Sequence, residues 1–162
     1  MSAAGHAMDG EARFRLCLAV FFLQLCFSGF SEATRVAYCD KKGNYAVKVS
    51  GVEISPDPVA RGEPATFEIS AKTGQDISGG KVVIDVSYFG IHVRTETHDL
   101  CEEASCPITA GQFLLSHTQT LPAFTPPGSY TLKMRMEDEK NEQLTCISFN
   151  FKIGFGSEIS DS

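Results

Sequence analysis

Apolar and polar residues alternate with a period of two along most of the chain from Tyr45 onward. This period predicts β-strands, because successive side chains of a strand point to opposite faces of its sheet. Gly51 interrupts the first alternating segment, which resumes at Val52, so a bulge or bend is expected there. The two prolines of Ser55-Pro56-Asp57-Pro58 end this strand, since proline cannot donate to a sheet ladder.

The same alternation recurs in further segments, which are separated by glycines or polar turns. After Gly90 the apolar phase shifts to Ile91 and Val93, so this end of a strand is expected to bend or twist. The polar residues 137–143 predict a hairpin turn. The expected strands after the first one span residues 66–71, 81–89, 113–121, 130–136 and 144–153. About seven short strands and no convincing helical segment predict an all-β, two-sheet sandwich.

The N-terminal part of the chain has the features of a secretory signal peptide. Arg13 and Arg15 precede an apolar run over residues 16–27. This run is shorter than the roughly 20 residues that span a bilayer. Cleavage is expected after Ala33, with cleavage after Ser31 and an uncleaved anchor as the alternatives.

This interpretation divides the chain into three parts. A signal peptide is expected at 1–33, one domain at 34–155 and a flexible tail at 156–162. The protein is expected to be secreted or to reside in the lumen of a vacuole or lysosome, both of which are reached through the secretory pathway.

Removal of the signal peptide changes the number of available cysteines. Six are present, and Cys17 and Cys26 lie in the signal. An even number in an oxidising compartment predicts two disulfides, for which three pairings are open. A bond between neighbouring cysteines would pin one loop, and the remaining pair would then close a loop of about a hundred residues. The remaining cysteines are Cys39, Cys101, Cys106 and Cys146.

Composition and motifs argue against several classes of function. The chain has 14 basic and 20 acidic residues, a net charge of −6, and no basic cluster of the kind that binds nucleic acid. It has no G-x-S-x-G motif, no phosphate-binding glycine loop and no persuasive Ser/His/Asp or Cys/His spacing. No catalytic residue and no cofactor are therefore expected.

A metal site is also not expected. Cys101 and Cys106 have a zinc half-site spacing, but no second tight pair exists and a secreted chain would oxidise them. Several histidines and acidic residues are scattered around the same loop. A metal site is the alternative for them, but they are expected to form a solvated polar rim. These residues are His92, His98, Asp99, Glu102 and Glu103.

Four motifs, in order, resemble those of the ML-domain (lipid-recognition) family. Cys39-Asp40 precedes a valine-rich strand, and Ser55-Pro56-Asp57-Pro58 follows that strand. Ser105-Cys106-Pro107-Ile108 is similar to the family's C-P-I after a small disulfide loop. Residues 134–146 resemble its strand, acidic D-x-x-N turn and cysteine-bearing strand. The resemblance covers residues 36–153 and includes both Niemann–Pick-type sterol carriers and phosphatidylglycerol/phosphatidylinositol transfer proteins.

The resemblance implies an immunoglobulin-like sandwich whose two sheets are splayed around one lipid. It also implies the disulfides Cys39–Cys146 and Cys101–Cys106. The segment 55–58 lacks the cysteine that animal sterol carriers of the family place there. The implied function is non-enzymatic binding and intermembrane transfer of a sterol or phospholipid, with transient membrane contact. The alternatives are a lipid-sensing adaptor for a membrane-receptor ectodomain and an adhesion sandwich without a cavity.

The candidate lipid-binding residues are apolar and lie on inward strand faces or in two loops. The inward faces carry almost no charge, so a headgroup is expected at the cavity mouth and not inside. The mouth is expected at the 90–93 turn and the 121–127 loop. The candidates are Phe67, Ile69, Val82, Ile84, Val86, Tyr88, Ile91, Val93, Leu121, Pro122, Phe124, Tyr130, Leu132, Met134, Phe149 and Phe151.

Overall fold

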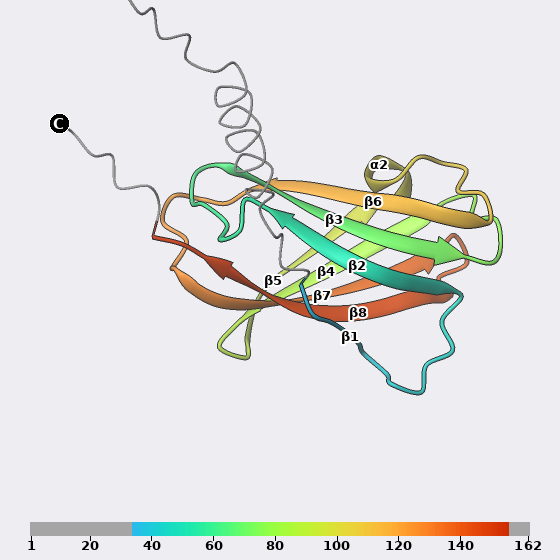
Figure 1. The fold of residues 1–162 in the computed structure, drawn as a ribbon, viewed down its shortest axis with the longest axis horizontal. Helices are drawn as coiled ribbons and strands as arrows, with labels where there is room; N and C mark the ends of the chain where they lie inside the picture. The colour runs from blue at the N-terminus through green and yellow to red at the C-terminus, as the bar shows by residue number, and fades with distance from the viewer. Residues whose placement is uncertain (1–33, 156–162) are drawn as a thin grey trace, which may run out of the picture. The chain divides into compact units, whose positions relative to one another are not determined.

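A computed structural model describes residues 34–155 of the chain, and they form two antiparallel β-sheets that pack face to face (Figure 1). The predicted all-β, immunoglobulin-like sandwich is confirmed. The predicted signal peptide at 1–33 and the predicted tail at 156–162 lie outside the described residues. Within the described residues, no helix is long and apolar enough to cross a bilayer.

The larger sheet has five strands and the smaller sheet has three. In spatial order the larger sheet contains β1 (Val36–Tyr38), β8 (Gln143–Ile153), β7 (Gly128–Asp138), β4 (Gly80–Tyr88) and β5 (Ile91–Asp99). The smaller sheet contains β2 (Val47–Ser55), β3 (Pro64–Thr73) and β6 (Gly111–Thr120). A single helical turn, α2 (Leu100–Glu103), connects the two sheets between β5 and β6.

Two features predicted from glycine, proline and polar turn residues are confirmed. The register of β2 against β3 shifts between Val49 and Gly51, which is the predicted irregularity, and β2 ends at Ser55. The hairpin between β7 and β8 is also present. The Asp138 side chain accepts hydrogen bonds from the backbone N–H groups of Lys140 (2.8 Å) and Glu142 (2.9 Å), which fixes this turn.

The structure adds elements that the alternation did not predict. β1 is only three residues long. β5 is a full strand of nine residues, whereas only a bent end was expected there. Most of its side chains are exposed, because it is the last strand of its sheet, so its sequence carries no apolar alternation. The helical turn α2 is also new. It begins after Asp99, whose carboxylate accepts a hydrogen bond from the Cys101 N–H (2.8 Å).

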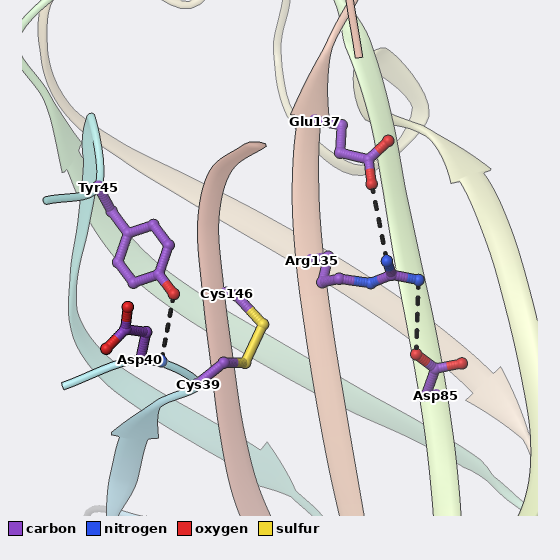
Figure 2. Close-up of a disulfide and its surroundings, with 7 residues drawn as sticks. All are labelled: Cys39, Asp40, Tyr45, Asp85, Arg135, Glu137 and Cys146. Carbon is purple, nitrogen blue, oxygen red and sulfur yellow. Dashed lines mark hydrogen bonds and ion pairs between the residues drawn. A yellow bond between two sulfur atoms is a disulfide. The ribbon is translucent and has the colours of Figure 1, made fainter. Parts of the chain in front are cut away.

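The predicted disulfide pairing is confirmed, and the longer bond ties the end of β1 to β8 within the larger sheet. Cys39 is joined to Cys146 of β8 (Figure 2), and Cys101 is joined to Cys106. Beside the first bond, the Tyr38 hydroxyl accepts a hydrogen bond from the Val49 N–H of β2 (2.9 Å). This contact links β1 to β2, the end strands of the two sheets at this edge.

The outward face of the larger sheet carries paired charges. Arg135 of β7 lies between Asp85 of β4 (3.7 Å) and Glu137 (4.0 Å), as Figure 2 shows. Such partly exposed pairs contribute at most about 1 kcal/mol each. Arg135 alternates with the buried Met134 and Met136, so the opposite face of this sheet forms the core and the cavity.

Candidate functional site

A cavity of about 340 Å³ lies between the two sheets. Its volume is near the lower end of the roughly 300–1,000 Å³ range of ligand pockets. Most of its lining is apolar and comes from residues that the sequence predicted. The predicted residues that line it are Phe67, Ile84, Val86, Tyr88, Val93, Leu121, Pro122, Phe124, Tyr130, Leu132 and Phe151.

The other five predicted residues do not line the cavity. Four of them, Ile69, Val82, Met134 and Phe149, are buried in the core away from it. They share their strand faces with residues that line the cavity but belong to the packed core. Ile91 is 70% exposed and is the first residue of β5, so residues 91–93 belong to a strand and not to the predicted turn. Alternation identifies the inward face of a strand but not the part of that face where the sheets separate.

Aromatic rings form one wall of the cavity. Phe151 meets the edge of Phe67 at a centroid distance of 5.4 Å and stacks on Tyr130 at 5.6 Å. Tyr130 in turn stacks on Tyr88 at 4.6 Å. Contacts of this kind contribute about 0.5–1.5 kcal/mol beyond the apolar area that they bury, so they stabilise this wall of the cavity.

The two tyrosines also hold the loop at the cavity mouth. The Tyr130 hydroxyl donates a hydrogen bond to the Pro126 carbonyl (2.8 Å), and the Tyr88 hydroxyl donates one to the Pro127 carbonyl (3.1 Å). Burial, and secondarily the nearby Tyr88, raises the pKa of Tyr130, because the charged phenolate is disfavoured there. Both hydroxyl groups therefore anchor the 121–127 loop.

Exposed apolar side chains surround the mouth. Phe124 is 86% exposed and Val93 is 53% exposed, and both line the cavity. Phe89, in the turn after β4, and Ile91, the first residue of β5, are also exposed. We call these four residues the apolar rim. Exposed apolar patches next to a cavity mark surfaces for a membrane, a ligand or a partner protein.

The cavity also has a polar wall, which contradicts the expectation that no charge is buried there. Arg94, Glu96, His117 and Gln119 line it. The pairing of the strands explains why these polar residues face the cavity. Arg94 and Glu96 of β5 pair with Val86 and Ile84 of β4 and therefore share their inward face. His117 of β6 pairs with the inward Phe67 in the same way.

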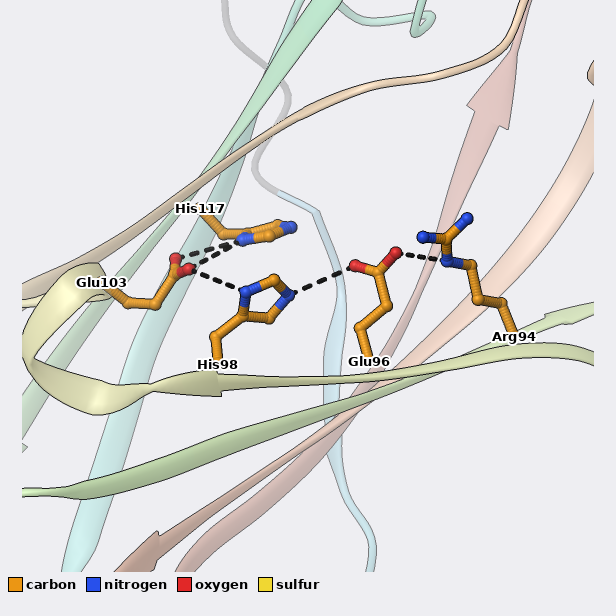
Figure 3. Close-up of polar contacts among 5 residues, drawn as sticks. All are labelled: Arg94, Glu96, His98, Glu103 and His117. Carbon is orange, nitrogen blue, oxygen red and sulfur yellow. Dashed lines mark hydrogen bonds and ion pairs between the residues drawn. The ribbon is translucent and has the colours of Figure 1, made fainter.

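The polar wall belongs to a larger group that bridges β5, α2 and β6 (Figure 3). We call Arg94, Glu96, His98, Glu103 and His117 the inter-sheet cluster. Arg94 pairs with Glu96, and Glu96 Oε2 lies 3.2 Å from His98 Nε2. His117 Nδ1 lies 3.0 and 3.1 Å from the two carboxylate oxygens of Glu103. The cluster thus forms a continuous polar chain from one sheet to the other.

The expected solvated rim is therefore wrong for two of its members. The side chain of Glu103 is 9% exposed and that of His98 is 25% exposed, so both lie partly inside the sandwich. Asp99 instead caps α2, and Glu102 and His92 are exposed. Cys101 and Cys106 form a disulfide and are not zinc ligands.

Sequence reasoning missed His117 although a signal was present. His117 and Gln119 are in phase with Leu115 and Leu121, at the positions of β6 that point inward. Glu96 and His98 are likewise in phase with the buried Leu100. A polar residue in an apolar phase of a strand is a sign of a buried polar group.

Together, the sandwich, the apolar cavity and its exposed rim define a small carrier-like β-domain. A family model described as the ML domain matches residues 33–153, and the chain therefore belongs to the ML-domain family. This match confirms the resemblance seen in its cysteine and turn motifs.

Similar proteins and structures agree with this assignment. The chain is 34% identical over 119 residues to a phosphatidylglycerol/phosphatidylinositol transfer protein of Debaryomyces hansenii, covering 70% of this chain and 61% of that protein. It is 33% identical over 152 residues to the MD-2-related lipid-recognition protein ROSY1 of Arabidopsis thaliana, covering 88% and 92%. A Niemann-Pick type C2 protein from Japanese carpenter ant has the same fold, with a TM-score of 0.60, 19% identity, and coverage of 74% and 99%.

Proposed function

We propose that this protein binds a single lipid between its sheets and carries it between membranes, without catalysing a reaction. The observation that carries the proposal is the apolar cavity that opens at the apolar rim. The acyl chain of the lipid packs against the aromatic wall formed by Phe67, Tyr130 and Phe151. Each methylene buried there contributes about 0.8 kcal/mol, so a single chain binds without a polar anchor.

The ligand is proposed to be a phospholipid. The names of the Debaryomyces hansenii and Arabidopsis thaliana relatives support this, and the former names phosphatidylglycerol and phosphatidylinositol. The chain spans 61% of the Debaryomyces hansenii protein, so the activity of that whole protein is an analogy for this one. The absence of cysteine from residues 55–58 separates this chain from the animal sterol carriers that the sequence resembles.

A cavity of about 340 Å³ is small for a complete phospholipid. Two features of the structure would allow a phospholipid to bind nevertheless. The headgroup is proposed to remain at the mouth, next to Arg94, whose side chain is 61% exposed. The sheets are proposed to separate further when a chain enters, at the edge where β5 and β6 are not paired with each other.

The proposed site of action is an extracellular or endolysosomal compartment. Two disulfides support this location, because they persist in oxidising environments. Phe124, Ile91 and Val93 are proposed to touch the membrane surface while the lipid enters or leaves. A membrane-receptor ectodomain is the alternative partner for the same rim.

A transfer assay between vesicles tests this function. Donor vesicles carry fluorescent phosphatidylglycerol and a quencher, acceptor vesicles carry neither, and the protein is the only variable. The rate of dequenching is expected to rise in proportion to protein concentration. A protein that binds the lipid but does not speed its exchange would support presentation to a receptor, and a protein that takes up only sterol would overturn the proposed ligand class.

A further inference from the structure

The inter-sheet cluster contains three side chains whose ligand atoms converge. One nitrogen from each of His98 and His117 and one carboxylate oxygen of Glu96 lie within 4.8 Å of one another. Figure 3 shows the two imidazoles side by side, with a nitrogen of each ring on the side that faces Glu96. The ring centroids are 4.6 Å apart. His98 and Glu96 come from β5, and His117 comes from β6 of the other sheet.

Glu103 fixes the orientation of His117. An ionised carboxylate only accepts hydrogen bonds, so His117 Nδ1, which contacts both oxygens of Glu103, carries the hydrogen. In a neutral ring this leaves the lone pair on Nε2, and this atom makes no hydrogen bond within residues 34–155. Glu103 also lies 3.6 Å from His98 Nδ1. One carboxylate therefore faces the Nδ1 side of both histidines.

This arrangement matches the outer shell of known metal sites. Histidines that bind a metal usually donate their other N–H to a carboxylate, which orients the ring and increases its basicity. Here Glu103 occupies the carboxylate position, and Arg94 holds Oε1 of Glu96, so Oε2 is left to face His98. Two imidazole nitrogens and one carboxylate oxygen form a common zinc ligand set.

The three ligand atoms need only a local movement to reach the spacing of a tetrahedral zinc site. Ligand atoms of a tetrahedral zinc site are about 3.4 Å apart when the bonds are about 2.0–2.2 Å. His98 Nε2 and Glu96 Oε2 are already 3.2 Å apart. His117 would approach them by a small rotation of its ring and of the β6 edge.

We propose that His98, His117 and Glu96 bind one Zn²⁺ ion, with Glu103 as the carboxylate that orients both histidines. The fourth position faces the cavity, which Glu96 and His117 line, and a water molecule fills it. The ion joins β5 of the larger sheet to β6 of the smaller sheet. These are the end strands of the two sheets, and they are not paired with each other. Zinc therefore joins the two sheets at the edge opposite the Tyr38–Val49 contact.

Zinc binding is measured on the oxidised protein after treatment with EDTA. Isothermal titration is expected to show one Zn²⁺ per chain, and the thermal midpoint is expected to rise with the Zn²⁺ concentration. His98→Gln and His117→Gln are each expected to weaken binding at least tenfold. Glu103→Gln is expected to weaken it by about 10–100-fold, as is typical of outer-shell partners. His92→Gln is the matched control, because His92 is exposed and outside the cluster, and it is expected to bind as the wild type does.

A measurement on the wild type avoids any folding defect of the variants. In a long-range ¹H–¹⁵N spectrum of the imidazoles, Zn²⁺ is expected to shift Nε2 of His98 and His117 and to leave both nitrogens of His92 unchanged. Absence of stoichiometric binding would overturn the proposal. So would an equal shift at all three histidines, or unchanged affinity in folded His98→Gln and His117→Gln variants.

Discussion

The imidazole of His98 on β5 lies 4.6 Å from that of His117 on β6, measured between ring centroids. These strands end the two sheets on one side of the sandwich. On the other side, the end strands β1 and β2 are joined through Tyr38 and Val49, next to the Cys39–Cys146 bond. A hydrogen bond thus connects the sheets at one edge, and the inter-sheet cluster connects them at the other. Only the edge with the inter-sheet cluster borders the cavity. In the metal-free protein, an increase in the separation of the sheets is therefore expected at β5 and β6.

Removal of Glu103 tests the contribution of the polar edge to stability. Glu103→Ala leaves the mostly buried His117 without its partner for Nδ1. In metal-free buffer this is expected to lower the free energy of unfolding by about 1–3 kcal/mol. Glu102→Ala, at the neighbouring exposed position, is the control and is expected to change it by less than about 0.5 kcal/mol. Equal values for the two variants in urea unfolding would contradict the role of Glu103.

The two disulfides are expected to differ in their effect on stability. Cys39 and Cys146 are 107 positions apart, and Cys101 and Cys106 are 5 apart. The chain-entropy model assigns about 4.7 kcal/mol to a loop of about 100 residues and about 2 kcal/mol to a loop of this short length. Chemical unfolding of the two double-serine variants measures this difference. A larger loss on removal of Cys101–Cys106 would show that the small loop has a role beyond chain entropy.

The most exposed residue of the apolar rim is expected to affect transfer and not folding. Phe124→Asp places a charge where the membrane is proposed to touch, so transfer between vesicles is expected to slow severalfold while the thermal midpoint changes little. Leu114→Asp is the matched control, because Leu114 is 48% exposed and does not line the cavity. Unchanged transfer by folded Phe124→Asp would remove this residue from the proposed membrane contact.

A larger side chain inside the cavity is expected to compete with the lipid. Val86→Phe adds volume at a half-buried cavity position, so less lipid is expected to bind while the lipid-free protein keeps its stability. Val49→Phe, at a half-buried position of β2 outside the cavity, is expected to leave lipid binding unchanged. The amount of phospholipid that copurifies with each variant measures the effect. Equal amounts would place the acyl chain elsewhere.

The raised pKa of Tyr130 predicts a loss of stability at high pH. The fold favours the neutral phenol, so the stabilising contribution is complete below the ordinary value of about 10 and is lost as pH rises through the raised pKa of the folded state. Tyr130→Phe removes this dependence and, at neutral pH, the hydrogen bond to Pro126, which is worth about 1 kcal/mol. Unfolding curves from pH 8 to about 11 compare the two proteins. Parallel pH profiles would contradict the assignment.

The architecture was predictable because it depends on alternation and turns. β7 is the clearest case, since Leu132 and Met134 point inward as their phase requires. The bulge at Gly51 was predictable from one interruption of the same pattern. These features are local, so the order of residues along one strand is sufficient to predict them.

The candidate site was only partly predictable, because a cavity depends on distances between sheets. Met134 and Leu132 share one strand face, yet only Leu132 lines the cavity. The inter-sheet cluster was missed for the same reason. Its two histidines are 19 positions apart on different sheets. Only the folded chain, in which α2 contacts both β5 and β6, brings them together.

The central claim is that the cavity holds one lipid, and native mass spectrometry of the secreted, oxidised protein tests it most directly. The account predicts a mass that exceeds that of the polypeptide by one phospholipid, which organic extraction then identifies. The lipid-free mass, unchanged after incubation with mixed phosphatidylglycerol, phosphatidylinositol and sterol vesicles, would contradict it. That result would mean that the cavity is not a lipid site and that the apolar rim serves a protein partner.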